Sequence, residues 1–145
     1  MKNQRHGGFL ISKIHQISAR IFARMLKQYG IEDINPAQGR IMFALWQNDG
    51  IAINDLSKET SLSKSTLTSM LDRLEKNGFL RREPSNRDRR KIYIWRTEKD
   101  KSFQKQYVRV SEKMTDMVYQ GFTEEEMENF ERMLKRIFDN LKESE

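Results

Sequence analysis

Apolar residues recur at steps of three and four along much of the chain, a spacing that places side chains on one face of a helix. The first such segment covers residues 9–28 and stops before Gly30, a residue typical of helix C-caps. A second segment opens at Asn35-Pro36, where Asn suits the N-cap and Pro the first helical position, and it ends at Gly50. The pattern therefore predicts two helices in the first third of the chain.

Shorter elements follow in the middle of the chain. Residues 51–53 predict a short extended piece, and Asn54 is placed to cap a brief helix over residues 55–60. After a turn, Ser63 is placed to cap another helix, which stops at Gly78. The apolar face of this helix consists of positions i, i+3, i+4 and i+7: Leu67, Met70, Leu71 and Leu74.

A pair of strands is predicted after this helix. The stretches FLRRE, residues 79–83, and KIYIW, residues 91–95, are rich in branched and aromatic residues, as strands are. The link between them, PSNRDRR, contains Pro, Ser, Asn and Asp, which favour turns. These features predict a hairpin with an arginine-rich tip.

Two further helices are predicted in the C-terminal third. Thr97 caps a long helix over about residues 98–120, which Gly121 breaks. Thr123 and Glu126 have the spacing of a capping box and begin the last helix. The apolar residues of the last helix are Met127, Phe130, Met133, Leu134, Ile137, Phe138 and Leu141.

The apolar stripes over residues 9–26 and 127–141 lie at opposite ends of the chain, and neither has an obvious partner large enough to cover both. A homodimer would bury both stripes, as helix-rich interfaces do. The alternative is that the two stripes cover each other within one chain. With 145 residues, 7 Gly, 2 Pro and no evident linker, the sequence indicates a single domain over residues 1–145.

Charge is distributed unevenly along a chain whose formal net charge is +6 at pH 7. Residues 81–101 hold nine Lys or Arg and four Asp or Glu, whereas residues 123–145 hold four and eight. A basic middle and an acidic end predict a surface that binds a polyanion. The alternative is a surface whose charges are merely solvated.

Several classes of function are disfavoured by what the sequence lacks. Without cysteine there are no disulfides, redox thiols or thiolate metal sites. His6 and His15 are the only histidines, so neither a metal nor another cofactor is expected. The sequence has no glycine-rich phosphate loop or nucleophile elbow, so an enzyme is not expected. No apolar run could span a bilayer and no signal peptide is evident, so a cytoplasmic protein without a membrane partner is expected.

A short helix, a tight turn, a second helix and a hairpin occur in the order of a winged helix-turn-helix, so the predicted fold class is mainly α (α+β winged helix). Small hydroxyls would let the second helix approach base edges and phosphates of double-stranded DNA, and arginines at the hairpin tip suit a narrow minor groove. Asp88, between those arginines, is interpreted as a brace that pairs with Arg90 or Arg87. The predicted DNA-binding residues are Ser63, Lys64, Ser65, Thr66, Thr68, Ser69 and Arg73 on the helix and Arg87, Arg89 and Arg90 on the wing.

The stretch DLSKETSLSKSTLTSMLDRLEKNGFLRREPSNRDRRKIYI resembles the MarR family of bacterial and archaeal transcription regulators. The resemblance rests on Leu56-Ser57, on the Ser-rich helix up to Arg73, on the phrase LEKNG that follows it, and on the Asp-Arg-Arg run that begins at Asp88. The resemblance implies a ligand-responsive repressor that acts as a homodimer and binds a pseudo-palindromic operator. The implied dimerisation helices are residues 9–30 and 98–143, and the implied winged helix-turn-helix region is residues 35–97. Without the family, the fold alone also allows a protein-interaction module or a nonspecific architectural DNA binder.

The same resemblance implies a cleft between the dimer body and the winged region, where a small anionic or aromatic effector would bind and release DNA. The candidate cleft residues are His15, Arg20, Phe22, Arg24, Phe43 and Trp46. A histidine on an amphipathic helix is more often a core or interface residue than a ligand.

The sequence departs from the family pattern at Arg96. The family usually has a hydrophobic residue just before the Thr that follows the second wing strand, and here Arg96 precedes Thr97. Either Trp95 turns inward through a small bulge, or Arg96 extends outward from a looser strand end. The register of the second wing strand near Arg96 stays open at this point.

Overall fold

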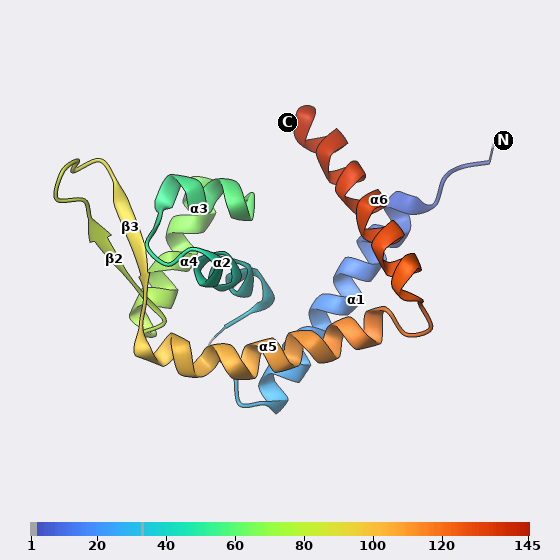
Figure 1. Cartoon of the computed structure of the whole chain (residues 1–145), viewed down its shortest axis with the longest axis horizontal. Coiled ribbons are helices and arrows are strands. Elements are labelled where there is room, and N and C mark those ends of the chain that lie inside the picture. Colours follow the sequence, from blue (N-terminus) through green and yellow to red (C-terminus); the bar gives the residue numbers. More distant parts are fainter. Residues whose placement is uncertain (1–2, 33) are drawn as a thin grey trace. The chain divides into compact units, whose positions relative to one another are not determined.

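The computed structural model describes residues 3–32 and 34–145, which fold mainly into helices with one small antiparallel sheet. The chain divides into two compact units, Met1–Val110 and Ser111–Glu145. The predicted fold class, mainly α with a winged helix-turn-helix, is confirmed. The elements, in order, are α1 (Gly7–Gln28), α2 (Pro36–Gln47), β1 (Ile51–Ala52), α3 (Ile53–Thr60), α4 (Lys64–Lys76), β2 (Leu80–Pro84), β3 (Ile92–Arg96), α5 (Glu98–Val118) and α6 (Glu124–Glu143) (Figure 1).

Side chains cap four helices at the predicted residues; at the start of α5, Thr97 Oγ1 accepts the backbone N–H of Asp100 at 3.2 Å. Asn35 Oδ1 accepts the backbone N–H of Gln38 at 2.8 Å, and Gln38 Oε1 accepts the backbone N–H of Asn35 at 3.0 Å. This reciprocal pair is a capping box, and Thr123 and Glu126 form another at the start of α6. Ser63 caps α4 through its hydroxyl. The caps satisfy N–H groups that the first turn of a helix leaves without partners.

The prediction that Asn54 caps the short third helix is wrong. α3 begins two residues earlier than predicted, at Ile53, with Ala52 at the N-cap and no side-chain cap bond. The reason lies in the sheet, because Ile51 and Ala52 pair with β3 and fix the point at which the chain turns into the helix.

β3 is the central strand of the sheet, with β1 on one side and β2 on the other. β2 and β3 pair without interruption from Leu80 opposite Arg96 to Pro84 opposite Ile92. The wing therefore has a regular antiparallel ladder, and the predicted hairpin is confirmed.

Neither of the two arrangements predicted for Arg96 occurs. The regular ladder leaves no bulge through which Trp95 could turn inward, and its ring instead covers Gly50, where an added Cβ would lie 2.7 Å from the ring. Alternation along the strand puts Arg96 on the same face as the buried Ile94. Its guanidinium turns inward to Asp100, with Nε 2.6 Å from Oδ2. A buried counter-charge thus permits arginine at a position where a hydrophobic residue is expected.

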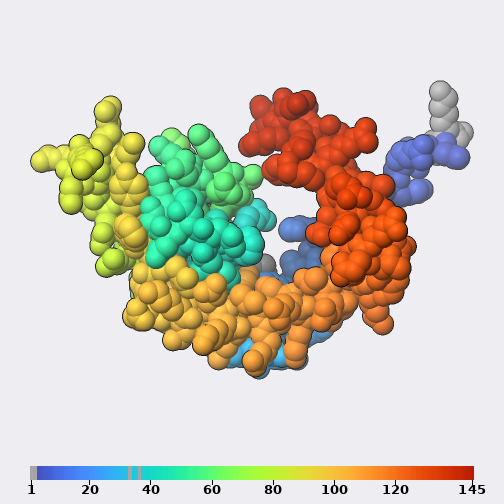
Figure 2. Space-filling view, viewed as in Figure 1, coloured from blue at the N-terminus to red at the C-terminus, as the bar shows by residue number. Residues whose placement is uncertain are grey.

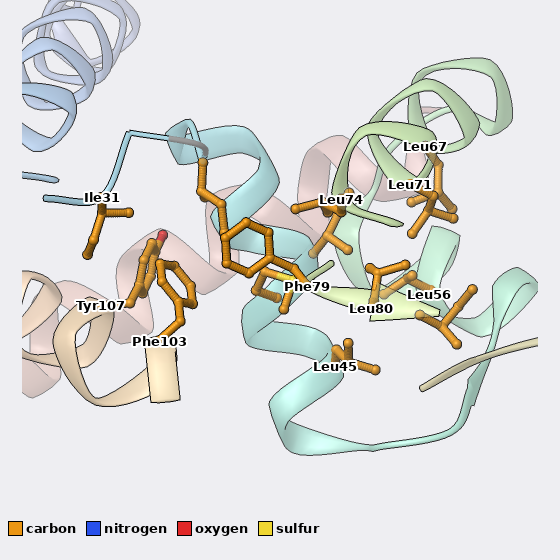
Figure 3. Close-up of a cluster of buried hydrophobic side chains, with 14 of the residues drawn as sticks. Ile31, Leu45, Leu56, Leu67, Leu71, Leu74, Phe79, Leu80, Phe103 and Tyr107 are labelled. Carbon is orange, nitrogen blue, oxygen red and sulfur yellow. The ribbon is translucent and has the colours of Figure 1, made fainter. Parts of the chain in front are cut away.

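The core of the first unit includes one complete face of α4. Leu67, Leu71 and Leu74 are fully buried with Leu56 of α3 (Figure 3). Met70 is half-buried. Full burial of a leucine stabilises a fold by about 1.5–3 kcal/mol. The leucine stripe therefore fixes the orientation of α4 and leaves its opposite face exposed.

Apolar side chains remain exposed in both units. In the first unit, most of them lie on α1: Phe9, Leu10, Ile11, Ile14 and Ile17. In the second unit, the rings of Tyr119, Phe122 and Phe130 pack with centroids 5.6–6.4 Å apart. The exposed apolar residues of α6 are Phe130, Met133, Leu134, Ile137, Phe138 and Leu141. Within the described residues, no helix carries an apolar stretch that could cross a membrane.

Candidate DNA-binding surface

The face of α4 opposite the leucine stripe carries small polar and basic side chains. Ser63 Oγ accepts the backbone N–H of Thr66 at 3.3 Å, so this hydroxyl has a structural role. Thr68 Oγ1 donates to the carbonyl of Lys64 at 2.8 Å, which leaves its lone pairs free to accept. The structure places all the helix residues predicted to bind DNA on this exposed surface: Ser63, Lys64, Ser65, Thr66, Thr68, Ser69 and Arg73.

The tip of the wing is ordered by its own polar groups. Ser85 Oγ accepts the backbone N–H groups of Arg87 at 3.1 Å and Asp88 at 3.2 Å. Asp88 Oδ1 accepts the backbone N–H of Arg90 at 3.0 Å and lies 3.4 Å from its Nε. The geometry thus places Asp88 against Arg90 rather than Arg87. Arg87, Arg89 and Arg90 are exposed, and the tip extends beyond the helices of the same unit (Figure 2).

Arg82 of β2 connects the wing to α4. Its Nη2 lies 2.7 Å from Asp72 Oδ1 and 2.7 Å from Glu75 Oε1. The backbone N–H of Arg82 donates to Glu75 Oε2 at 2.9 Å, and Nε donates to Oε1 at 3.0 Å. These hydrogen bonds lower the pKa of Glu75, and the bond from the backbone N–H has the largest effect. The side-chain hydrogen bond to Glu75 raises the pKa of Arg82. We call this set of contacts the Arg82 tie.

The Arg82 tie is a feature that sequence reasoning misses. The sequence pattern predicts no contact among the side chains of Asp72, Glu75 and Arg82. The available signal is the pair of acids three residues apart on α4, on a flank that the arginine of the next strand can reach.

Replacement of Glu75 by Gln is expected to lower the free energy of unfolding at pH 7 by about 1 kcal/mol, a value discounted because the group is partly exposed. Since folding lowers the pKa of Glu75, the wild-type carboxylate stabilises the fold above its unfolded pKa, ordinarily near 4.5, and this contribution disappears as pH falls through the folded value. The difference between wild type and variant should therefore shrink in acid.

Urea unfolding at pH 7 and at about pH 3 measures this difference. Glu83→Gln is the matched control, because Glu83 lies on the same wing and contacts only the exposed Arg81, at 3.4 Å, among the described charges. A pH-independent loss for Glu75→Gln would show that the charge does not carry the effect.

Asp100, in the first turn of α5, is fully buried and joins three elements. Its Oδ1 accepts the indole N–H of Trp46 at 2.8 Å, and its Oδ2 accepts Nε of Arg96. Arg96 also donates from Nη2 to Gln104 Oε1 at 2.5 Å and from its backbone N–H to Asp49 Oδ1 at 2.8 Å. One buried ion pair therefore links α2, β3 and α5.

The residues predicted for an effector cleft lie in different places. Phe22 and Trp46 meet at the ring of Tyr107, with centroid distances of 5.5 and 5.4 Å. Phe43 is 58% exposed and lines a separate hollow of about 420 Å³ formed by α2, α3 and β1 residues. The remaining candidates are exposed on α1: His15, Arg20 and Arg24.

An exposed, hydroxyl-lined helix that follows a short helix and a tight turn, with an arginine-tipped hairpin after it, defines a winged helix-turn-helix DNA-binding protein. Residues 34–92 match the model of the MarR family. The uncharacterized HTH-type transcriptional regulator YsmB of Bacillus subtilis (strain 168) is 30% identical over 131 residues, which cover 86% of this chain and 89% of that protein. The chain belongs to the MarR family, whose members are transcriptional regulators and not enzymes.

Two further relatives give the similarity a functional context. The HTH-type transcriptional repressor YetL of B. subtilis (strain 168) is 25% identical over 134 residues, which cover 91% of this chain and 80% of that protein. A mutant MarR from Escherichia coli, solved in complex with operator DNA, superposes with a TM-score of 0.80 at 26% identity. That superposition covers 90% of this chain and 91% of the other.

Proposed function

We propose that this protein is a homodimer that binds a pseudo-palindromic DNA site and represses transcription. The observation that carries the proposal is the exposed face of α4, which is small, polar and basic while the opposite face is buried leucine. Such side chains approach base edges and phosphates closely. The repressor YetL and the operator complex of MarR support the assignment of class.

In this proposal α4 lies in the major groove and the wing lies along the flanking minor groove. The N-terminus of α4 directs N–H groups at a phosphate. Arg87, Arg89 and Arg90 place guanidinium groups where a narrow minor groove concentrates negative potential. The Arg82 tie keeps the wing and α4 at a constant spacing, so that both reach the same duplex.

The dimer follows from the apolar residues that one chain leaves exposed. Large exposed apolar patches mark association sites, and both α1 and α6 carry them. Residues 9–30 and 98–143 form the dimerisation body, and residues 35–97 form the DNA-binding region. In a symmetric dimer the two copies of α4 meet half-sites about one helical turn apart.

A small anionic or aromatic effector would control release from DNA. The exposed arginines of α1 and the exposed ring of Phe43 supply suitable chemistry, but they line no common hollow among those described. A regulator of this kind works in the cytoplasm, where it meets its DNA site.

Selection of bound duplexes from random or genomic DNA tests the proposal directly. We expect a two-fold site, and binding that keeps a large preference for this site as salt rises while affinity for random DNA falls steeply. Equal affinity for every duplex at moderate ionic strength would reject sequence-specific regulation and favour an architectural role. Absence of any DNA binding would favour a protein-interaction module.

Replacement of Arg90 by Ala is expected to weaken binding to the selected site by about 1–3 kcal/mol. The wing tip would lose a guanidinium whose side chain is 92% exposed, so the fold should be unaffected. Fluorescence anisotropy with labelled duplex measures the change. Arg109→Ala is a charge-matched control, because Arg109 is exposed on α5 rather than on the wing. Equal affinity of Arg90→Ala and wild type would remove the wing from the mechanism.

A further inference from the structure

A hollow of about 390 Å³ opens between the exposed face of α4 and the start of α2. Its lining residues are Asn35 and Gln38 from α2 and its cap, and Ser65, Thr66, Ser69, Met70 and Arg73 from α4. A second hollow, of about 370 Å³, shares Asn35, Gln38 and Arg73 and adds Glu32, Lys76 and Asn77. We call the first of these the α2–α4 hollow.

Gln38 contributes a hydrogen-bond donor for which no described residue supplies an acceptor. The side chain is only 4% exposed, and its Oε1 is occupied by the backbone N–H of Asn35. That bond identifies the other amide atom as Nε2, for which no acceptor occurs among the described residues. Gln38 lines the hollow, and no buried side-chain N or O atom in the described part lacks a partner, so we take Nε2 as the donor that Gln38 offers there.

The α2–α4 hollow is built for a ligand that accepts hydrogen bonds. Besides Gln38 Nε2, it offers the hydroxyls of Ser65, Thr66 and Ser69 and the guanidinium of Arg73, and its described lining contains no acid. The adjoining hollow contributes Lys76 on the same flank, with Glu32 as its acid. A phosphate group combines negative charge with several acceptor oxygens, which is the chemistry that this donor set fits.

We infer that the α2–α4 hollow receives a phosphate of the DNA backbone, held by Gln38 Nε2 and Arg73. This inference rests on the proposed function, because it requires α4 to lie against DNA. In helix-turn-helix proteins, an element beside the recognition helix contacts the DNA backbone. Here the start of α2 lies beside α4 at the hollow. The contact sets the register of the protein on the duplex and carries no sequence information.

Gln38→Glu tests the inference with little change in shape. Glutamate keeps an acceptor for the Asn35 N–H, as capping boxes do with either residue, but it replaces the donor with an anion. We expect binding at least about tenfold weaker for the selected site and for random duplex alike, with the ratio between them unchanged. Gln47→Glu, at the exposed C-terminal end of the same helix, is the charge-matched control and should bind as wild type does.

Duplexes with single neutral methylphosphonates identify the phosphate. In wild type, a methylphosphonate at any contacted phosphate should weaken binding, and at one of these positions in each half-site Gln38→Glu should lose no further affinity. A folded Gln38→Glu with wild-type affinity overturns the inference, as do losses that add at every position. If Gln38→Glu does not fold, Ser69→Asp places an anion at the same hollow from an exposed residue.

Two further outcomes distinguish this inference from a failure of the proposed function and from the binding of a free anion. Wild type that does not distinguish the selected site from random DNA defeats the proposed function itself, whatever the variant does. Inorganic phosphate at constant ionic strength tests for a free anion instead. Competition by phosphate that Gln38→Glu abolishes, without any sensitive methylphosphonate position, would assign the hollow to a small anion and reject the DNA contact.

Discussion

Replacement of Asp100 by Ala is expected to lower the free energy of unfolding by about 3–5 kcal/mol, because it leaves a largely buried guanidinium without its carboxylate. The side chain of Arg96 is 14% exposed and that of Asp100 is 0% exposed, so water reaches this pair poorly. The indole N–H of Trp46 loses its acceptor in the same variant. Equilibrium unfolding in urea, followed by Trp fluorescence and by circular dichroism, measures the loss.

The reason for this loss can be isolated by a double-mutant cycle. Arg96→Met alone leaves the Asp100 carboxylate buried without its counter-charge and should also destabilise strongly, whereas Arg96→Met with Asp100→Leu should recover much of the stability. Asp139→Ala is the exposed control, since its partner Lys135 lies on the surface of α6, and it should cost less than about 1 kcal/mol. A loss below that level for Asp100→Ala would contradict the structural role of the pair.

Replacement of Ile14 by Glu is expected to convert the dimer to a monomer at micromolar concentration and to raise its dissociation constant by at least about a hundredfold. Ile14 is 55% exposed on α1 in the single chain, within the apolar stripe that the proposed partner covers. An unpaired carboxylate in that interface costs several kcal/mol, since nothing there replaces its water. Analytical ultracentrifugation of wild type and variant gives the measurement.

Gln16→Glu controls for the added charge in the Ile14 experiment. Gln16 is exposed on the same helix but lies two positions further on, which turns it about 200° away from Ile14. It should leave both the dimer and DNA binding intact. A wild type that sediments as a monomer would contradict the proposed interface, and so would an Ile14→Glu variant that dimerises as well as wild type does.

Helix patterning and caps predict most of this fold. The leucine stripe of α4, the capping box of Asn35 and Gln38, and the arginine-tipped hairpin are local features, and they form as expected. Errors occur where distant residues decide the outcome. Strand pairing with β3 shifts the start of α3 away from Asn54, and a carboxylate on the next helix turns Arg96 inward.

In the candidate site, too, local features are predictable from the sequence and features that depend on distant residues are not. The exposed face of α4 is predictable because amphipathic spacing separates its leucines from its hydroxyls. The Arg82 tie and the α2–α4 hollow that Gln38 lines cannot be predicted in this way, because each depends on two elements that meet only in the folded chain. The residues predicted for an effector cleft do not lie together, since Phe22 and Trp46 both pack on Tyr107 while Phe43 lines a different hollow.

Because Arg82 bonds to both Asp72 and Glu75, the wing and α4 can be exchanged between proteins only as one unit. An engineer who grafts α4 from another regulator to reprogramme the operator must carry over both acids, or exchange the hairpin with the helix. A graft that lacks Asp72 and Glu75 leaves Arg82 without these two partners, so the hairpin is no longer held in its orientation relative to α4. The chimera would then lose affinity for every promoter.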